Sequence, residues 1–144
     1  MFANTLSNKW VETITLVTTL DLIVFEVDRI GFGIPMTKID RIISSVFLGE
    51  DYSLTQNVDI LDLHYHLTGE SIVSPTSIVL WIDAHQQLAA IPIETVPVMV
   101  SVPLDRIRTL PSDFRQQDQL GIASHIAIIT DDENTESTIF ILAD

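Results

Sequence analysis

The residues best suited to chemistry are an aspartate and two histidines that alternate along one segment, Asp62, His64 and His66. The pattern predicts a strand over residues 58–63, and alternate residues of a strand project from the same face. Two imidazoles and a carboxylate on one face form a ligand set for a divalent metal ion. The favoured alternative is a strand end that faces solvent, so we predict no tight metal binding.

Other patterns that support catalysis are missing or incomplete. The chain has no cysteine, which excludes disulfides, thiolate zinc sites and cysteine nucleophiles. Gly31 and Gly33 fall in a predicted hairpin and lack the third glycine of a phosphate-binding loop. Paired acids occur only in predicted loops, where a solvated charge run is the ordinary interpretation. We therefore predict a non-enzymatic protein with no catalytic residues, cofactor or metal.

Acidic residues dominate the charge of the chain. The 144 residues include 20 Asp and Glu against 7 Lys and Arg, for a formal net charge of −13. Nucleic-acid binders neutralise phosphates with clustered Lys and Arg, and neither residue occurs between Arg41 and Arg106. No apolar run approaches the ~20 residues that a membrane-spanning helix needs. These features predict a cytoplasmic protein without nucleic-acid binding or membrane insertion, whose partners are proteins or small molecules.

Alternating apolar residues predict an all-β domain with one or two short helices. One hairpin is predicted from residues 22–28 and 30–35, and a second from residues 78–83 and a return strand that ends near residue 93. The return strands end in similar motifs, Gly33-Ile34-Pro35-Met36 and Ala90-Ile91-Pro92-Ile93. The repeat indicates two small β-subdomains that share one core.

The rest of the chain has weaker patterns. Ile39, Ile42, Ile43 and Val46 are spaced as one face of a helix over residues 38–46. Residues 1–19 are predicted to form an N-terminal extension ahead of a domain at residues 20–144. The remaining predicted elements are a short strand at residues 13–18, a strand at 98–102, a connector at 103–111, and a final hairpin of residues 122–130 with 138–143.

The order of these features resembles the CheW-like domain family. Leu22-Ile23-Val24-Phe25-Glu26-Val27, the return strand to Pro35 and the predicted helix resemble the opening of that domain. Ile93-Glu94-Thr95-Val96 and Leu120-Gly121-Ile122-Ala123 resemble two of its later motifs, so the similarity covers about residues 20–144. It implies two packed SH3-like β-barrels. It also implies a non-catalytic adaptor that couples chemoreceptors to the histidine kinase CheA, or works in related pilus or phototaxis pathways.

The chain departs from the family pattern at three positions. Leu54-Thr55 stands where the family has Arg-Gly, Asp59 replaces a proline, and Glu94 replaces an aspartate. The Arg-Gly pair is the most recognisable motif of the family. The resemblance is therefore to a divergent member with a narrowed or changed set of partners.

The resemblance implies partner surfaces on residues 38–46 and 49–63. The implied partners are a CheA-type kinase and the cytoplasmic domain of a receptor. The candidate contact residues are Ile39, Ile42, Tyr52, Leu54, Thr55, Asp62 and Glu94. For the isoleucines, the favoured alternative is that they fill the core. Two other hypotheses remain, a ligand- or metal-binding β-domain centred on Asp62, and a self-associating assembly subunit; the oligomeric state stays open.

Overall fold

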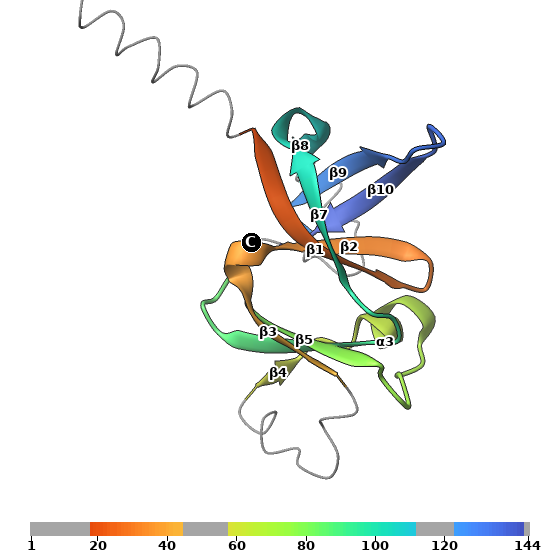
Figure 1. The fold of residues 1–144 in the computed structure, drawn as a ribbon. Helices are drawn as coiled ribbons and strands as arrows, with labels where there is room; N and C mark the ends of the chain where they lie inside the picture. The colour runs from red at the N-terminus through yellow and green to blue at the C-terminus, as the bar shows by residue number, and fades with distance from the viewer. Residues whose placement is uncertain (1–17, 45–57, 112–122, 143–144) are drawn as a thin grey trace, which may run out of the picture.

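The computed structural model describes residues 18–44, 58–111 and 123–142, and strands dominate these ranges (Figure 1). None of the helices in them has the length and apolar character of a membrane span. The described elements are, in chain order, β1 (Thr19–Val27), β2 (Ile30–Pro35), the 3-10 turn η1 (Met36–Lys38), β3 (Ile39–Ser44), β4 (Asp59–Ile60), α3 (Leu63–Thr68), β5 (Ser77–Ile82), β6 (Leu88–Ile93), β7 (Val98–Pro103), the 3-10 turn η3 (Leu104–Arg106), β8 (Ile107–Thr109), β9 (His125–Thr130) and β10 (Glu136–Ile141). The predicted mostly-β class is confirmed.

The strands form two curled sheets that lie one against the other. The large sheet has the strand order β7-β1-β2-β10-β9-β8, and the small sheet has the order β3-β5-β6-β4. Figure 1 shows the large sheet above the small one, with the chain crossing down after η1 and returning along β7. Each sheet is therefore completed by strands that are distant in sequence.

The two predicted hairpins are present and pair in the same register. Leu22 pairs with Pro35 in the β1–β2 hairpin, and Ile78 pairs with Pro92 in the β5–β6 hairpin. Asp28 and Arg29 form the tip of the first hairpin with φ values of 51° and 68°. Positive φ at both central residues is the signature of the tight turn whose twist matches the flanking strands. The short internal repeat in the sequence therefore corresponds to two equivalent hairpins.

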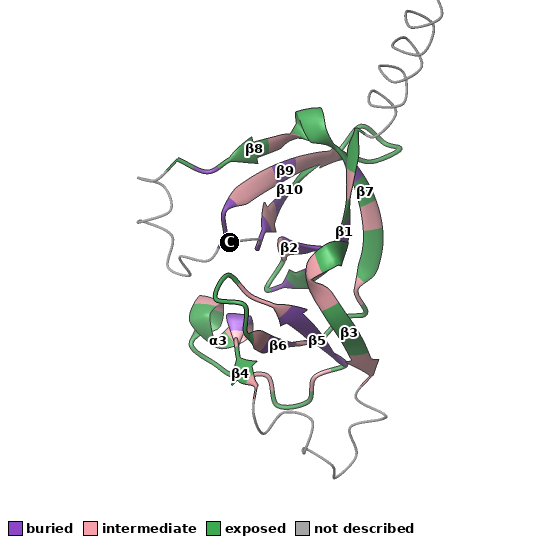
Figure 2. Ribbon diagram, turned by 90° about the vertical axis from the view of Figure 1, so that its left-hand side faces the viewer, coloured by how far each residue is buried: buried purple, intermediate pink, exposed green. Residues whose placement is uncertain are grey.

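The core follows the alternation of side chains along the strands. On β1, Leu22 faces a cluster inside the large sheet, whereas Phe25 and Val27 face the small sheet. On β5, alternate residues likewise divide between a cluster inside the small sheet and the space between the sheets. In Figure 2, buried stretches of β2 and β5 lie on the facing sides of the two sheets. We call this central cluster the shared core; its buried members are Phe25, Val27, Phe32, Ile34, Leu63, Val79, Trp81, Ala89, Ile91, Ile93, Leu110, Ala123 and Leu142.

Gly33 of β2 lies close to two side chains inside the large sheet. A Cβ placed on Gly33 would lie 3.2 Å from Cγ2 of Ile139 and 3.3 Å from Cδ1 of Leu22. These separations are shorter than ordinary carbon–carbon contacts of about 3.5–4.0 Å. Glycine therefore allows Ile139 and Leu22 to approach the β2 backbone closely.

The predicted helix over residues 38–46 is wrong. The chain makes only the 3-10 turn η1 and then continues as β3, which pairs antiparallel with β5. The spacing of Ile39, Ile42 and Ile43 fitted one helix face, but β-branched side chains lose rotamer freedom in helices and pack well on sheets. A bulge between Ile39 and Arg41 lets the strand keep Ile39 against the shared core and Ile43 against the small-sheet cluster.

Two further boundaries need correction. The predicted strand at residues 58–63 is reduced to the two residues of β4, and α3 begins at Leu63. The predicted connector at residues 103–111 contains η3 and β8, which pairs with β9. The final hairpin is present as β9 and β10. The predicted strand at residues 13–18, and nearly all of the predicted extension, lie outside the described residues.

Candidate functional site

The helix α3 is short and is held at both ends by specific contacts. Its N-cap is Asp62, whose carboxylate accepts a hydrogen bond of 3.0 Å from the N–H of Tyr65. At the other end, Gly69 has a φ of 82° and its N–H donates to the carbonyl of Tyr65 over 2.8 Å. Leu63 is fully buried in the shared core and anchors the first turn. The carboxylate of Asp62 thus satisfies a helix terminus, a role that carboxylates often take.

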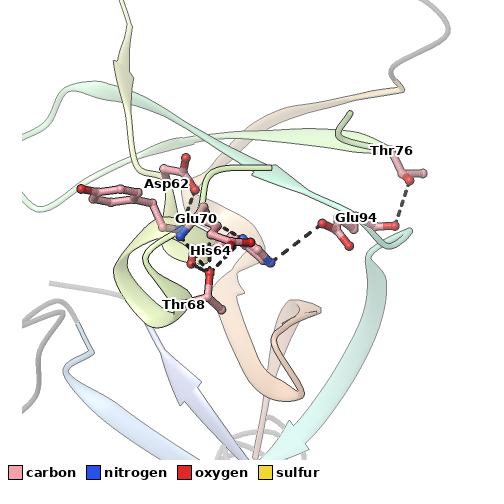
Figure 3. Close-up of polar contacts among 7 residues, drawn as sticks. Asp62, His64, Thr68, Glu70, Thr76 and Glu94 are labelled. Carbon is pink, nitrogen blue, oxygen red and sulfur yellow. Dashed lines mark hydrogen bonds and ion pairs between the residues drawn. The ribbon is translucent and has the colours of Figure 1, made fainter. Parts of the chain in front are cut away.

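His64 lies on α3 with a defined ring orientation (Figure 3). Its Nδ1 is 2.6 Å from the backbone carbonyl oxygen of Glu70. A carbonyl oxygen only accepts hydrogen bonds, so Nδ1 carries the proton in this contact. The other ring nitrogen, Nε2, lies 3.9 Å from Oε1 of Glu94. Figure 3 shows the imidazole between the end of its own helix and the carboxylate of Glu94.

Glu94 follows β6 directly and begins the connection that leads to β7. Its backbone carbonyl accepts a hydrogen bond of 2.8 Å from Oγ1 of Thr76, which fixes the start of this connection. The Glu94 side chain is 59% exposed. The His64–Glu94 contact therefore joins α3 to the connection by which the chain leaves the small sheet.

A pocket of about 210 Å³ lies beside this contact. Its volume is below the ~300–1,000 Å³ of ordinary small-molecule sites. It brings the tip of the β1–β2 hairpin, which belongs to the large sheet, next to α3 and the residues after β6. The lining residues are Glu26, Val27, Asp28, Arg29, His64, Ile72, Glu94 and Thr95. We call this the junction pocket, because residues attached to both sheets line it.

The premise of the metal hypothesis is wrong. Asp62, His64 and His66 lie on a helix cap and a helix, where residues two apart do not share one face. Asp62 is used as the N-cap, and His64 points its Nδ1 to a backbone carbonyl. Among the residues that the structure describes, no group of three or more His, Asp or Glu side chains is arranged to hold a metal ion.

The predicted contact residues lie in separate places. Ile39 is half-buried against the shared core, whereas Ile42 is 40% exposed on β3, an end strand of the small sheet. Asp62 is the N-cap of α3, two residues before His64, and Glu94 approaches His64 from the segment that follows β6. The predicted contacts Tyr52, Leu54 and Thr55 lie outside the described residues.

Exposed apolar residues lie along β7 and its flanks, with Val98 and Met99 on opposite faces of the strand. Val96, Val98, Met99 and Leu104 are between 51% and 70% exposed. No charged residue occurs from residue 96 to residue 104, and β7 is an end strand of the large sheet. End strands are usually protected by charges or by short length. We call these four residues the β7 strip.

The β7 strand was predicted from the sequence, but its exposed apolar residues were not. Val98, Met99 and Val100 are consecutive apolar residues, and consecutive residues of a strand point to opposite faces. Apolar residues on both faces of an end strand leave at least one of them exposed. The signal was present, but recognising it required knowing that β7 lies at the edge of its sheet.

No family model matches this chain, and no curated protein sequence matches it at a significant level. Among solved structures, the fold is similar to the crystal structure of the scaffolding protein TtCheW from Thermoanaerobacter tengcongensis. The two superpose with a TM-score of 0.60 at 15% sequence identity, over 86% of this chain and 84% of that chain. The expected fold, two packed SH3-like β-barrels arranged as in a CheW-like domain, is confirmed.

Proposed function

We propose that this chain is a non-catalytic adaptor of a chemotaxis-type signalling pathway, acting in the cytoplasm through protein–protein contacts. The domain that carries this function is residues 20–144, with residues 1–19 as an extension. The observation that carries the proposal is the β7 strip. Exposed apolar residues on an uncharged end strand are typical of a surface that another protein covers. The likeness of the fold to a scaffolding protein supports the same function.

The proposed partners are a CheA-type histidine kinase and the cytoplasmic domain of a receptor. Covering an apolar side chain stabilises a complex by about 25 cal/mol per Å² of apolar area removed from water. The chain carries a net charge of −13, so long-range repulsion disfavours partners with strongly acidic surfaces. We therefore expect partner surfaces that are apolar at the centre and neutral or basic at the rim.

The test is binding of the full chain to a CheA regulatory domain and to a receptor cytoplasmic fragment, measured by calorimetry. Met99→Asp should weaken at least one complex more than tenfold, because it places a charge in the β7 strip. The matched control is Val73→Asp, since Val73 is 95% exposed in a loop and lies outside the strip. Both variants should melt at the wild-type temperature.

Three outcomes would contradict the proposal. In the first, neither partner binds the wild-type chain. In the second, Met99→Asp and Val73→Asp bind the partners equally well. A third outcome concerns self-association, which sedimentation velocity of the wild type and of Met99→Asp detects. If the wild type forms oligomers that Met99→Asp dissolves while neither partner binds, the strip serves a self-associating assembly subunit.

A further inference from the structure

Two parts of the junction pocket meet at the ring of His64. At 2.6 Å from the carbonyl oxygen of Glu70, Nδ1 is the nitrogen that holds the hydrogen of the neutral ring. Nε2 then carries a lone pair and has nothing to donate to the carboxylate of Glu94, 3.9 Å away. When the ring gains a proton, the proton goes to Nε2, and both nitrogens become donors. The contact with Glu94 then becomes a charge-assisted hydrogen bond after a small approach.

The charged groups around His64 come from every element that lines the pocket. The β1–β2 hairpin contributes Glu26, Asp28 and Arg29, and the residues after β6 contribute Glu94. On the helix side, Asp62 is the N-cap, His66 is exposed, and Glu70 contacts the ring through its backbone oxygen. Three acidic residues and one arginine therefore line the pocket. The described residues contain no ion pair between Arg29 and these carboxylates.

We propose that His64 is a proton-operated clasp between α3 and the connection from β6 to β7. With Nε2 protonated, His64 donates to Glu94 and ties the helix to the segment by which the chain crosses to the large sheet. With Nε2 unprotonated, the helix keeps its bond to Glu70 and releases Glu94. The clasp closes when Nε2 gains a proton and opens when Nε2 loses it.

The first test is imidazole nitrogen NMR of the full chain in samples from about pH 8 to about pH 5, the interval in which histidine side chains in general change charge. At about pH 8, His64 should carry its hydrogen on Nδ1, while the exposed His66 serves as the reference ring without this constraint. On acidification, the side-chain carboxyl signal of Glu94 should shift with the same midpoint as Nε2 of His64. Two results would overturn the proposal. The neutral His64 ring carries its hydrogen on Nε2, or the Glu94 signal does not change when His64 gains a proton.

The second test is a double-mutant cycle on folding stability. His64→Asn removes the clasp alone. The asparagine side chain keeps an N–H near the position of Nδ1 but has no group at the position of Nε2. Glu94→Gln should lower the folding equilibrium constant roughly threefold at about pH 5.5, as expected for an exposed ion pair, and leave it unchanged at about pH 8. In the His64→Asn background, Glu94→Gln should change the folding equilibrium constant equally at both pH values. In the His66→Asn background, Glu94→Gln should keep the pH-dependent effect that it has in the wild type. Equal coupling at both pH values would show that no proton operates the contact.

Discussion

Oγ of Ser101 on β7 donates a hydrogen bond of 2.5 Å to the carboxylate of Asp21 on β1, eighty residues earlier in the chain. The two residues are also directly opposite in the antiparallel ladder between these strands. β7 is an end strand of the large sheet and pairs with β1, so this bond adds a side-chain contact to that pairing. The first prediction concerns this contact.

Ser101→Ala should destabilise the fold by about 1 kcal/mol, the usual worth of one hydrogen bond. Both side chains are exposed, so water replaces the lost partner and keeps the cost low. Chemical denaturation measures the effect, and Ser101→Thr is the control because it keeps the hydroxyl and suits a strand. A Ser101→Ala protein as stable as the Ser101→Thr protein would show that the bond contributes nothing.

Asp62→Ala should destabilise the fold by about 0.5–2 kcal/mol through loss of the α3 N-cap, whereas Asp62→Asn should stay close to the wild type because asparagine also caps helices. Thermal melts of the two variants give the comparison. Because Asp62 is used as a cap, adding zinc should not raise the melting temperature of the wild type. Tight, stoichiometric zinc binding that His64→Ala abolishes would restore the metal hypothesis.

Gly33→Ala should destabilise the fold by about 1–3 kcal/mol, the usual cost of an overpacked core. The new methyl group would press on Ile139 and Leu22 inside the large sheet. Gly69→Asn is the contrasting variant, since Gly69 has open space around it and asparagine tolerates its positive φ. Urea denaturation of both variants checks the prediction; a Gly33→Ala protein more stable than the wild type would mean that the sheet yields easily.

Leu54→Asp should weaken partner binding more than tenfold, about 1.4 kcal/mol, and leave the melting temperature unchanged. By the resemblance to CheW-like domains, Leu54 stands at an arginine position. Leucine can only bury apolar area, so a charge there would oppose an apolar partner. Binding and melting are measured on the same variant. A collapsed melt would assign Leu54 to the core, and unchanged binding with an unchanged melt would remove it from the interface.

The hairpins could be predicted because the residues that determine each hairpin lie close together in the sequence. Alternation from Leu22 to Val27, a two-residue tip and an answering strand all lie within one short stretch. The helix predicted around Ile42 failed because the spacing of its isoleucines fits two structures. The choice was made by pairing with Val79 on β5, far along the chain.

The candidate site was only partly predictable for the same reason. Asp62 and His64 were predicted together as candidate metal ligands, and Asp62 and Glu94 together as candidate partner contacts, but no pattern joined Glu94 to His64. The approach of Glu94 to His64 depends on how β6 leaves the small sheet, and the role of Asp62 depends on a helix only six residues long. A helix this short has too little periodicity to be recognised in a sequence.

The order in which the large sheet recruits its strands has a consequence for synthesis on the ribosome. The β1–β2 hairpin emerges early, but its two outer edges wait for β7 and for β10, the last strand of the described chain. The described strands of the small sheet have all emerged once β6 has been made, so this sheet is able to complete first. Until β10 arrives, the edge of β2 stays open to pairing with other nascent chains. Chains truncated before residue 136 should therefore aggregate far more than the full chain.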